Sequence, residues 1–104
     1  RAGDFIIVSG QGGLLDGKLV EGGVTAQTEQ TMRNIADRLA EAGATLDDVV
    51  KTLCFLTDMG TFAEFNDAYA KAFGDHRPAR STVEVSALPA GLSVEVEAWA
   101  YKPV

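Results

Sequence analysis

The chain has 104 residues, which suffices for one domain and not for two. Its formal net charge of −6 opposes nucleic-acid binding, because affinity for a phosphate backbone comes largely from lysine and arginine. No stretch approaches the roughly 20 apolar residues of a transmembrane helix, no secretory signal peptide is visible, and the single cysteine leaves no internal disulfide. We therefore expect one cytoplasmic domain over residues 1–104 that binds neither nucleic acid nor a membrane.

The first half of the chain predicts a strand, a hairpin and a helix. Residues 5–9, FIIVS, are apolar and β-branched and predict a buried strand. Asp16-Gly17 between apolar residues predicts a hairpin. A helix with Thr25 as a candidate cap and Gly43 at its end is then expected. Its apolar stripe recurs at helical spacing and comprises Thr28, Met32, Ile35, Ala36, Leu39 and Ala40.

A second strand and helix follow. Residues 49–57, VVKTLCFLT, are nearly continuous in apolar and β-branched side chains, which is typical of a central strand buried on both faces. Thr61 and Glu64 have the spacing of a capping box. The helix after them carries aromatic residues at steps of three or four and is expected to end at Gly74.

Residues 81–87 and 93–101 predict two last strands, which the short LPAGL segment is expected to join as a hairpin. Both helices are amphipathic, so we expect an α+β fold with the two helices on one face of a single mixed sheet. The inward side of the last strands would carry Val83, Val85, Val94, Val96, Ala98 and Ala100. The other side would carry Arg80, Thr82, Glu84, Glu95, Glu97, Trp99 and Tyr101, a candidate interface or pocket wall.

Two of the nine basic residues, Arg77 and Arg80, flank Pro78 where a strand begins. Pro78 fixes its own φ and restricts Ala79 to extended geometry, so the approach to Arg80 is stiff. A guanidinium matches a carboxylate with two parallel hydrogen bonds and keeps its charge. The residues alone leave Arg80 open between a surface ion pair and an anion-binding side chain.

Other polar positions also have two readings. Glu95 could position a water or transfer a proton, or lie exposed on its strand. Asn66 could tie helix to loop or line a pocket, and Gly10 could serve a tight turn or a close approach to a ligand. Cys54 is expected to be a small core residue and His76 to be solvated. Their separation gives no metal-site spacing, and no phosphate-binding loop is present, so we expect no metal or cofactor.

Five segments, in order along nearly the whole chain, resemble the YjgF/RidA family: VSGQ, NIADRLAEAGATLDDVVKTLCFLTDM, FAEFNDAYAKAF, RPARSTVEVSALP and VEVEAWA. The most specific is PARS before a V-E-V strand. The resemblance implies a chorismate-mutase-like α+β fold and a homotrimer with pockets between subunits. It also implies that residues 1–104 form one YjgF/RidA-like domain, whose upstream first strand and aromatic pocket residue precede this sequence.

For members that carry the arginine, the resemblance implies hydrolysis of reactive enamines and imines such as 2-aminoacrylate, which yields a 2-oxo acid and ammonia without a cofactor. Such an enzyme is a 2-iminobutanoate/2-iminopropanoate deaminase. The family's substrate-carboxylate arginine falls on Arg80 and the backbone contact after it on Thr82. The glycine of SGQ falls on Gly10, the asparagine of the second helix on Asn66, and the water-orienting glutamate on Glu95.

Three functions follow as hypotheses. The first is the imine deaminase, and the second is a non-catalytic regulatory trimer that binds a carboxylate ligand in the same pocket. The third is a ribonuclease, because the family has also been described as ribonucleases or translation inhibitors. It has been described as 2-aminomuconate deaminases as well. A ribonuclease needs a basic groove, which the net charge of −6 argues against. Gly12 and Gly13 stand where the family commonly has a bulkier apolar residue and proline, which bears on substrate choice.

The predicted hairpin has a consequence for the site. It would place Arg80 opposite about residue 99, four residues along the strand from Glu95. At about 3.3 Å per residue this is on the order of 13 Å, too far for one small substrate. We therefore expect a pocket that takes Arg80 from one chain and Glu95 from its neighbour in a homotrimer.

Overall fold

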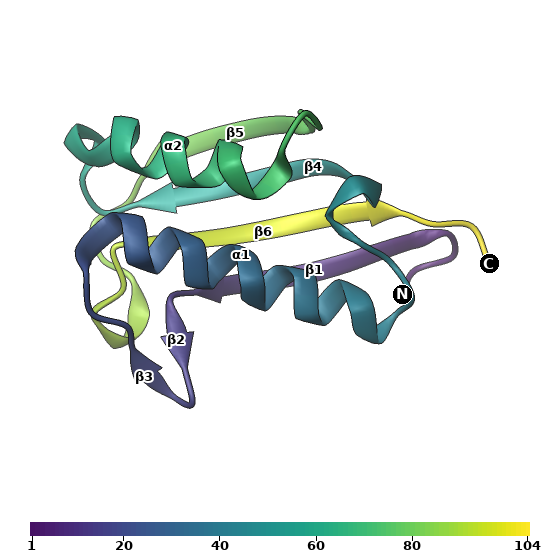
Figure 1. The fold of residues 1–104 in the computed structure, drawn as a ribbon, viewed down its shortest axis with the longest axis horizontal. Helices are drawn as coiled ribbons and strands as arrows, with labels where there is room; N and C mark the ends of the chain where they lie inside the picture. The colour runs from purple at the N-terminus through teal and green to yellow at the C-terminus, as the bar shows by residue number, and fades with distance from the viewer.

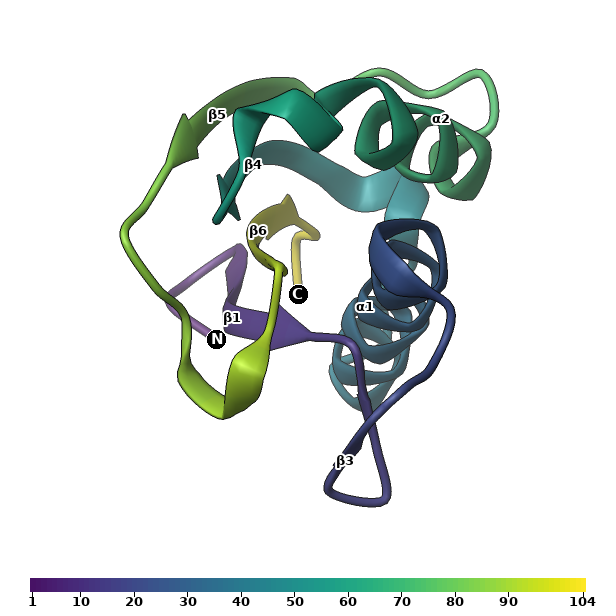
Figure 2. The ribbon, with the colours of Figure 1, turned by 90° about the vertical axis from the view of Figure 1, so that its left-hand side faces the viewer.

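A computed structural model describes residues 1–104 as one four-stranded sheet with two helices on one side of it (Figures 1 and 2). The strand order is β1-β6-β4-β5. Only the β4–β5 pair is parallel, so the sheet is mixed. The elements are β1 Phe5–Gly12, β2 Leu14–Leu15, β3 Lys18–Leu19, α1 Gly23–Glu41, β4 Val49–Leu56, α2 Phe62–Phe73, β5 Ala79–Glu84 and β6 Val94–Tyr101. The predicted α+β class and the placement of both helices on one face are confirmed.

The core lies between the helices and the sheet. The inward residues of β6 are fully buried, as predicted: Val94, Val96, Ala98 and Ala100. Ile35 and Leu39 of α1 and Phe65 of α2 pack into the same cluster, since the helical apolar stripes face the sheet. Neither helix combines the length and the apolar character needed to cross a bilayer.

The ends of the two helices are set by glycine residues and not by the predicted capping side chains. Gly43 and Gly74 have positive φ of 77° and 65° just past α1 and α2, so the predicted C-terminal ends are confirmed. The predicted cap at Thr25 is wrong, because α1 begins at Gly23. The predicted capping box at Thr61 is also wrong. The Thr61 hydroxyl donates to the Asp58 carbonyl at 2.6 Å instead of accepting from the helix.

The Asp16-Gly17 hairpin is confirmed between β2 and β3, with positive φ at both turn residues. The hairpin predicted between the last two strands is wrong. β5 pairs with β4 in parallel, whereas β6 lies between β1 and β4 (Figure 1). The physical reason is the helix before β5: a strand–helix–strand unit returns to the sheet in parallel. Residues 85–93, with a 3₁₀ turn at Pro89–Gly91, then cross the end of the sheet past β4.

This topology changes which face each side chain occupies. Arg80 and Thr82 pair with Thr52 and Cys54, which are buried under the helices, so they lie on the helix side of the sheet. The prediction that Arg80 and Thr82 share a face with Glu95 is therefore wrong. The side chains of Arg80 and Thr82 can point inward because the layer between α2 and the sheet is polar at this point.

The opposite face of the sheet carries apolar side chains that are open to solvent in one chain. Ile7 is 53% exposed and Val83 42% exposed, and the Phe5 and Tyr101 rings contact each other edge to face at 5.4 Å. The first strand and β4 are thus buried on one face only, and the prediction of burial on both faces of β4 is wrong for a single chain. We call this the open face.

Candidate functional site

The Arg80 guanidinium lies on the helix side of β5, the edge strand of the sheet. Its Nη1 donates a hydrogen bond of 2.7 Å to Oδ1 of Asn66 on α2. The ion pairs of the chain are Arg38–Glu41 and Lys102–Asp48, so Arg80 has no carboxylate partner. The alternative of a surface ion pair at Arg80 is therefore excluded within the chain.

Three aromatic rings of α2 hold this guanidinium. Its central carbon lies 4.8 Å from the ring centroid of Tyr69, 5.3 Å from that of Phe62 and 5.9 Å from that of Phe65. These separations are in the range of cation–π attraction, which fixes the group without using its N–H donors. The sequence predicted these rings as a core stripe only. The signal for the second role was the presence of Asn66 within that stripe.

The layer beneath Arg80 is polar and uncharged. The hydroxyls of Thr52 and Tyr69 lie 2.7 Å apart, and the Cys54 thiol donates weakly to Thr52 at 3.8 Å. Burial raises the pKa of Cys54 to about 11 and also raises the pKa of Tyr69, so both groups stay neutral at pH 7. Cys54 is fully buried, which confirms its prediction as a core residue. No negative charge in the layer beneath Arg80 therefore neutralises its guanidinium.

Thr82 is the next inward residue of β5. Its hydroxyl oxygen is buried and has no hydrogen-bond partner in the chain. Such orphaned buried groups are few in folded proteins and mark strain, a ligand or a bound water. It lies two residues beyond Arg80 on the same side of the strand.

A cavity of about 380 Å³ opens beside the guanidinium of Arg80. A volume of this size suits a small molecule. Its lining consists of Asn66, Tyr69, Ala70, Arg77, Pro78 and Arg80. We call it the arginine cavity.

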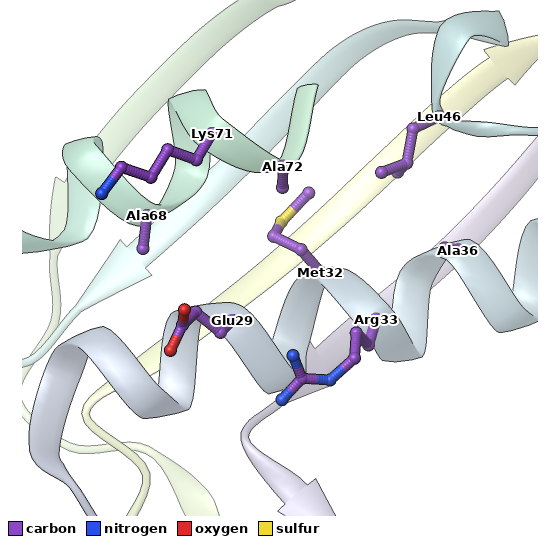
Figure 3. A pocket seen from close by; sticks show the side chains of 8 residues that line it. All are labelled: Glu29, Met32, Arg33, Ala36, Leu46, Ala68, Lys71 and Ala72. Carbon is purple, nitrogen blue, oxygen red and sulfur yellow. The ribbon is translucent and has the colours of Figure 1, made fainter. Parts of the chain in front are cut away.

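A second hollow lies on the outer surface between α1 and α2 (Figure 3). Met32 and Ala72 lie in its middle, while the charged side chains of Glu29, Arg33 and Lys71 lie around them and form no ion pair with one another. Because its charged groups do not converge, it lacks the polar constellation of a reaction site.

Gly10 and Glu95 lie together on the open face, where β1 pairs with β6. A side-chain carbon on Gly10 would stand 2.7 Å from Cδ and Oε2 of Glu95, so the carboxylate lies directly over the glycine. Any larger residue at Gly10 would displace it. Asn34 supports this end of β1, donating hydrogen bonds of 2.9 Å to the carbonyls of Gly12 and Leu14.

The five predicted site residues therefore form two groups. Arg80, Asn66 and Thr82 lie on the helix side, whereas Gly10 and Glu95 lie on the open face. Arg80 shares a row of the sheet with Ala98, three residues or about 10 Å along β6 from Glu95. The spacing that was predicted from a β5–β6 hairpin is wrong. The structure nevertheless agrees that one chain does not bring the two groups together.

His76 was expected to be solvated, and that prediction is wrong. Its Nε2 lies 2.7 Å from the Val49 carbonyl and its ring contacts Phe73, so it fastens the connection before β5 to the start of β4. This contact joins residues distant in sequence, and the polar loop composition gave no sign of it.

Comparisons with known proteins agree on one family. The family described as Endoribonuclease L-PSP matches residues 1–102. A RutC family protein of Pyrococcus horikoshii is 43% identical over 98% of this chain and 82% of its own length. A chloroplastic protein of Arabidopsis thaliana named Reactive Intermediate Deaminase A is 40% identical over 93% of the chain and 53% of its own length. The solved YjgF gene product of E. coli superposes with a TM-score of 0.91 at 37% identity, over 97% of this chain and 83% of that one.

Proposed function

This chain belongs to the YjgF/RidA family, and we propose that it hydrolyses reactive enamines and imines of 2-oxo acids to the 2-oxo acid and ammonia. The observation that carries the proposal is the guanidinium of Arg80, held by three rings and Asn66 beside a cavity and without a carboxylate of its own. The name of the Arabidopsis relative supports a deaminase.

Arg80 binds the carboxylate of the substrate. A guanidinium has five N–H donors, and the chain uses one, toward Asn66, so a forked pair remains for a carboxylate. A further donor follows from strand geometry. The Val85 amide donates to Leu56 of β4, and amides alternate along a strand, so that of Thr82 points to the free edge of the sheet. This free amide supports the backbone contact proposed at Thr82.

The chemistry needs little besides positioning. An enamine first tautomerises to its imine, whose carbon is electrophilic. Water adds to that carbon, and the resulting amino alcohol loses ammonia to leave the carbonyl of the 2-oxo acid. Glu95 holds the water, takes its proton on attack and returns a proton to the departing nitrogen.

The site is completed between chains in this proposal. Arg80 and Glu95 lie on opposite faces of one sheet, so a pocket containing both takes them from neighbouring copies. The open face, with exposed Ile7, Val83 and Tyr101, supplies apolar surface for such contact. We propose a homotrimer in which this face packs against the other subunits.

The test uses imino acids made in place by an amino-acid oxidase from alanine and 2-aminobutyrate. The purified protein should speed imine decay and release ammonia and the 2-oxo acid in equal amounts. Binding of pyruvate without faster imine decay would instead favour a regulatory trimer. If the protein neither binds nor turns over these compounds, the proposed function is refuted.

A further inference from the structure

The arginine cavity contains a second arginine that the proposed reaction does not use. Arg77 lines it together with Arg80, and Pro78 between them is also part of the lining. Neither arginine has a carboxylate partner, although acidic residues outnumber basic ones by 15 to 9 in this chain. Two unpaired guanidinium groups at one cavity create a site for more than one negative charge.

A structural role accounts for only part of Arg77. Its Nη1 donates to the carbonyls of Gly74 and His76, next to the C-terminus of α2, where a positive charge is favourable. Both of these bonds come from the same nitrogen, so Nε and Nη2 keep their donors. The bonds anchor the guanidinium at the edge of the cavity and leave it donors for a ligand.

The spacing of the two arginines fits a short substrate. Three residues of extended chain separate their Cα atoms by at most about 10 Å. Pro78 stiffens this segment, and the rings of α2 fix the guanidinium of Arg80. Carboxylates at the two ends of a four- or five-carbon acid can meet two long side chains set at this distance.

We propose that Arg77 is a specificity residue and that the preferred substrates are imines of dicarboxylic 2-oxo acids. This rests on the proposed function, with Arg80 taking the carboxylate beside the imine carbon. Arg77 takes the carboxylate at the far end, outside the reacting atoms. The dicarboxylate imines are formed by oxidation of acidic amino acids, which is the class of reaction that supplies this substrate.

The test compares substrates that differ only in the far group. 2-Iminosuccinate is matched with 2-iminobutanoate, and 2-iminoglutarate with 2-iminopentanoate, each made in place by an oxidase. The wild-type protein should have the higher kcat/KM for the dicarboxylate of at least one pair. Arg77→Gln should lower that preference about five- to tenfold, as expected for loss of one charge-assisted contact at a partly solvated site.

Three further measurements separate specificity from stability. Arg77→Lys should restore part of the preference, and added salt should weaken it, because the group is exposed. Arg38→Gln, which removes an exposed arginine paired with Glu41, should leave the preference unchanged. Equal loss for both members of a pair in Arg77→Gln, or no dicarboxylate preference in the wild type, overturns the proposal.

A binding arm keeps the inference separate from the proposed function. Oxaloacetate and 2-oxobutanoate are titrated against the wild type and Arg77→Gln by NMR. Tighter oxaloacetate binding that needs Arg77 supports the second anion site even if no imine is hydrolysed, in which case only the deaminase proposal fails. Equal affinities for the two acids, together with normal imine hydrolysis, overturn the second site and leave the deaminase intact.

Discussion

Replacing Arg80 with alanine removes the guanidinium that lies against Tyr69, Phe62 and Phe65 and donates to Asn66. Hydrogen bonds to charged groups contribute about 1.5–3 kcal/mol. Every 1.4 kcal/mol corresponds to a factor of ten, so kcat/KM for imine hydrolysis should fall at least ten- to a hundredfold. Arg80→Lys should not restore the full rate, because an ammonium lacks the planar fork.

Stability should respond much less than activity to the same substitution. Losing the cation–π contacts costs about 0.5–2 kcal/mol. The variant also removes a partly buried cation that no carboxylate neutralises, which offsets part of that cost. We therefore expect the circular dichroism spectrum, the assembly state and the melting temperature to stay close to wild type.

The assay follows decay of imines from alanine and 2-aminobutyrate for the wild type, Arg80→Ala and Arg80→Lys. Arg38→Ala is the matched control, since Arg38 is exposed and paired with Glu41 on α1. Wild-type turnover in a folded Arg80→Ala protein would refute the assignment of Arg80 to substrate binding. A rate loss that merely parallels unfolding would show that Arg80 is structural.

Two further predictions concern Glu95 and Cys54. Glu95→Gln should lower kcat more than it weakens pyruvate binding, because the role proposed for Glu95 lies in the chemical step; equal losses in the two measurements would remove the water-activating role. Burial holds the pKa of Cys54 near 11 against a reference of 9.0, so the folded state keeps a proton that the unfolded state loses in this range. The contribution of Cys54 to the free energy of unfolding should therefore fall by about 2 kcal/mol from pH 9 to pH 11, and denaturant titrations of Cys54→Val should show a total fall that is smaller by this amount; identical pH dependence in both proteins would contradict this.

Periodicity and glycine positions made the elements of this fold predictable. The apolar stripe through Ile35 and Leu39 and the glycines Gly43 and Gly74 are local features, and a local pattern encodes them directly. Strand pairing was not predictable in the same way, because nothing local in residues 81–87 states which strand they join. The helix before them was the better guide, since it favours a parallel return to β4.

The candidate site shows the same division. Arg80 could be picked out from its sequence context as the candidate anion-binding residue, and in the structure it donates a hydrogen bond to Asn66. The orientation of Arg80 could not be predicted, because the alternation of residues in β5 predicts that Val83 lies on the buried side. In the structure Val83 lies on the open face and Arg80 points toward the helices. The aromatic cradle and the position of Arg77 at the cavity are tertiary contacts that spacing alone does not reveal.

A pocket shared between subunits is tested most directly by complementation between two inactive chains. Arg80→Ala and Glu95→Ala proteins are unfolded together in equal amounts, refolded, and checked for mixed trimers by native mass spectrometry. If each pocket takes Arg80 from one subunit and Glu95 from its neighbour, about one interface in four carries both wild-type residues, and about a quarter of wild-type activity should return. Each variant refolded alone should stay inactive. No recovery in confirmed mixed trimers would contradict a pocket shared between chains.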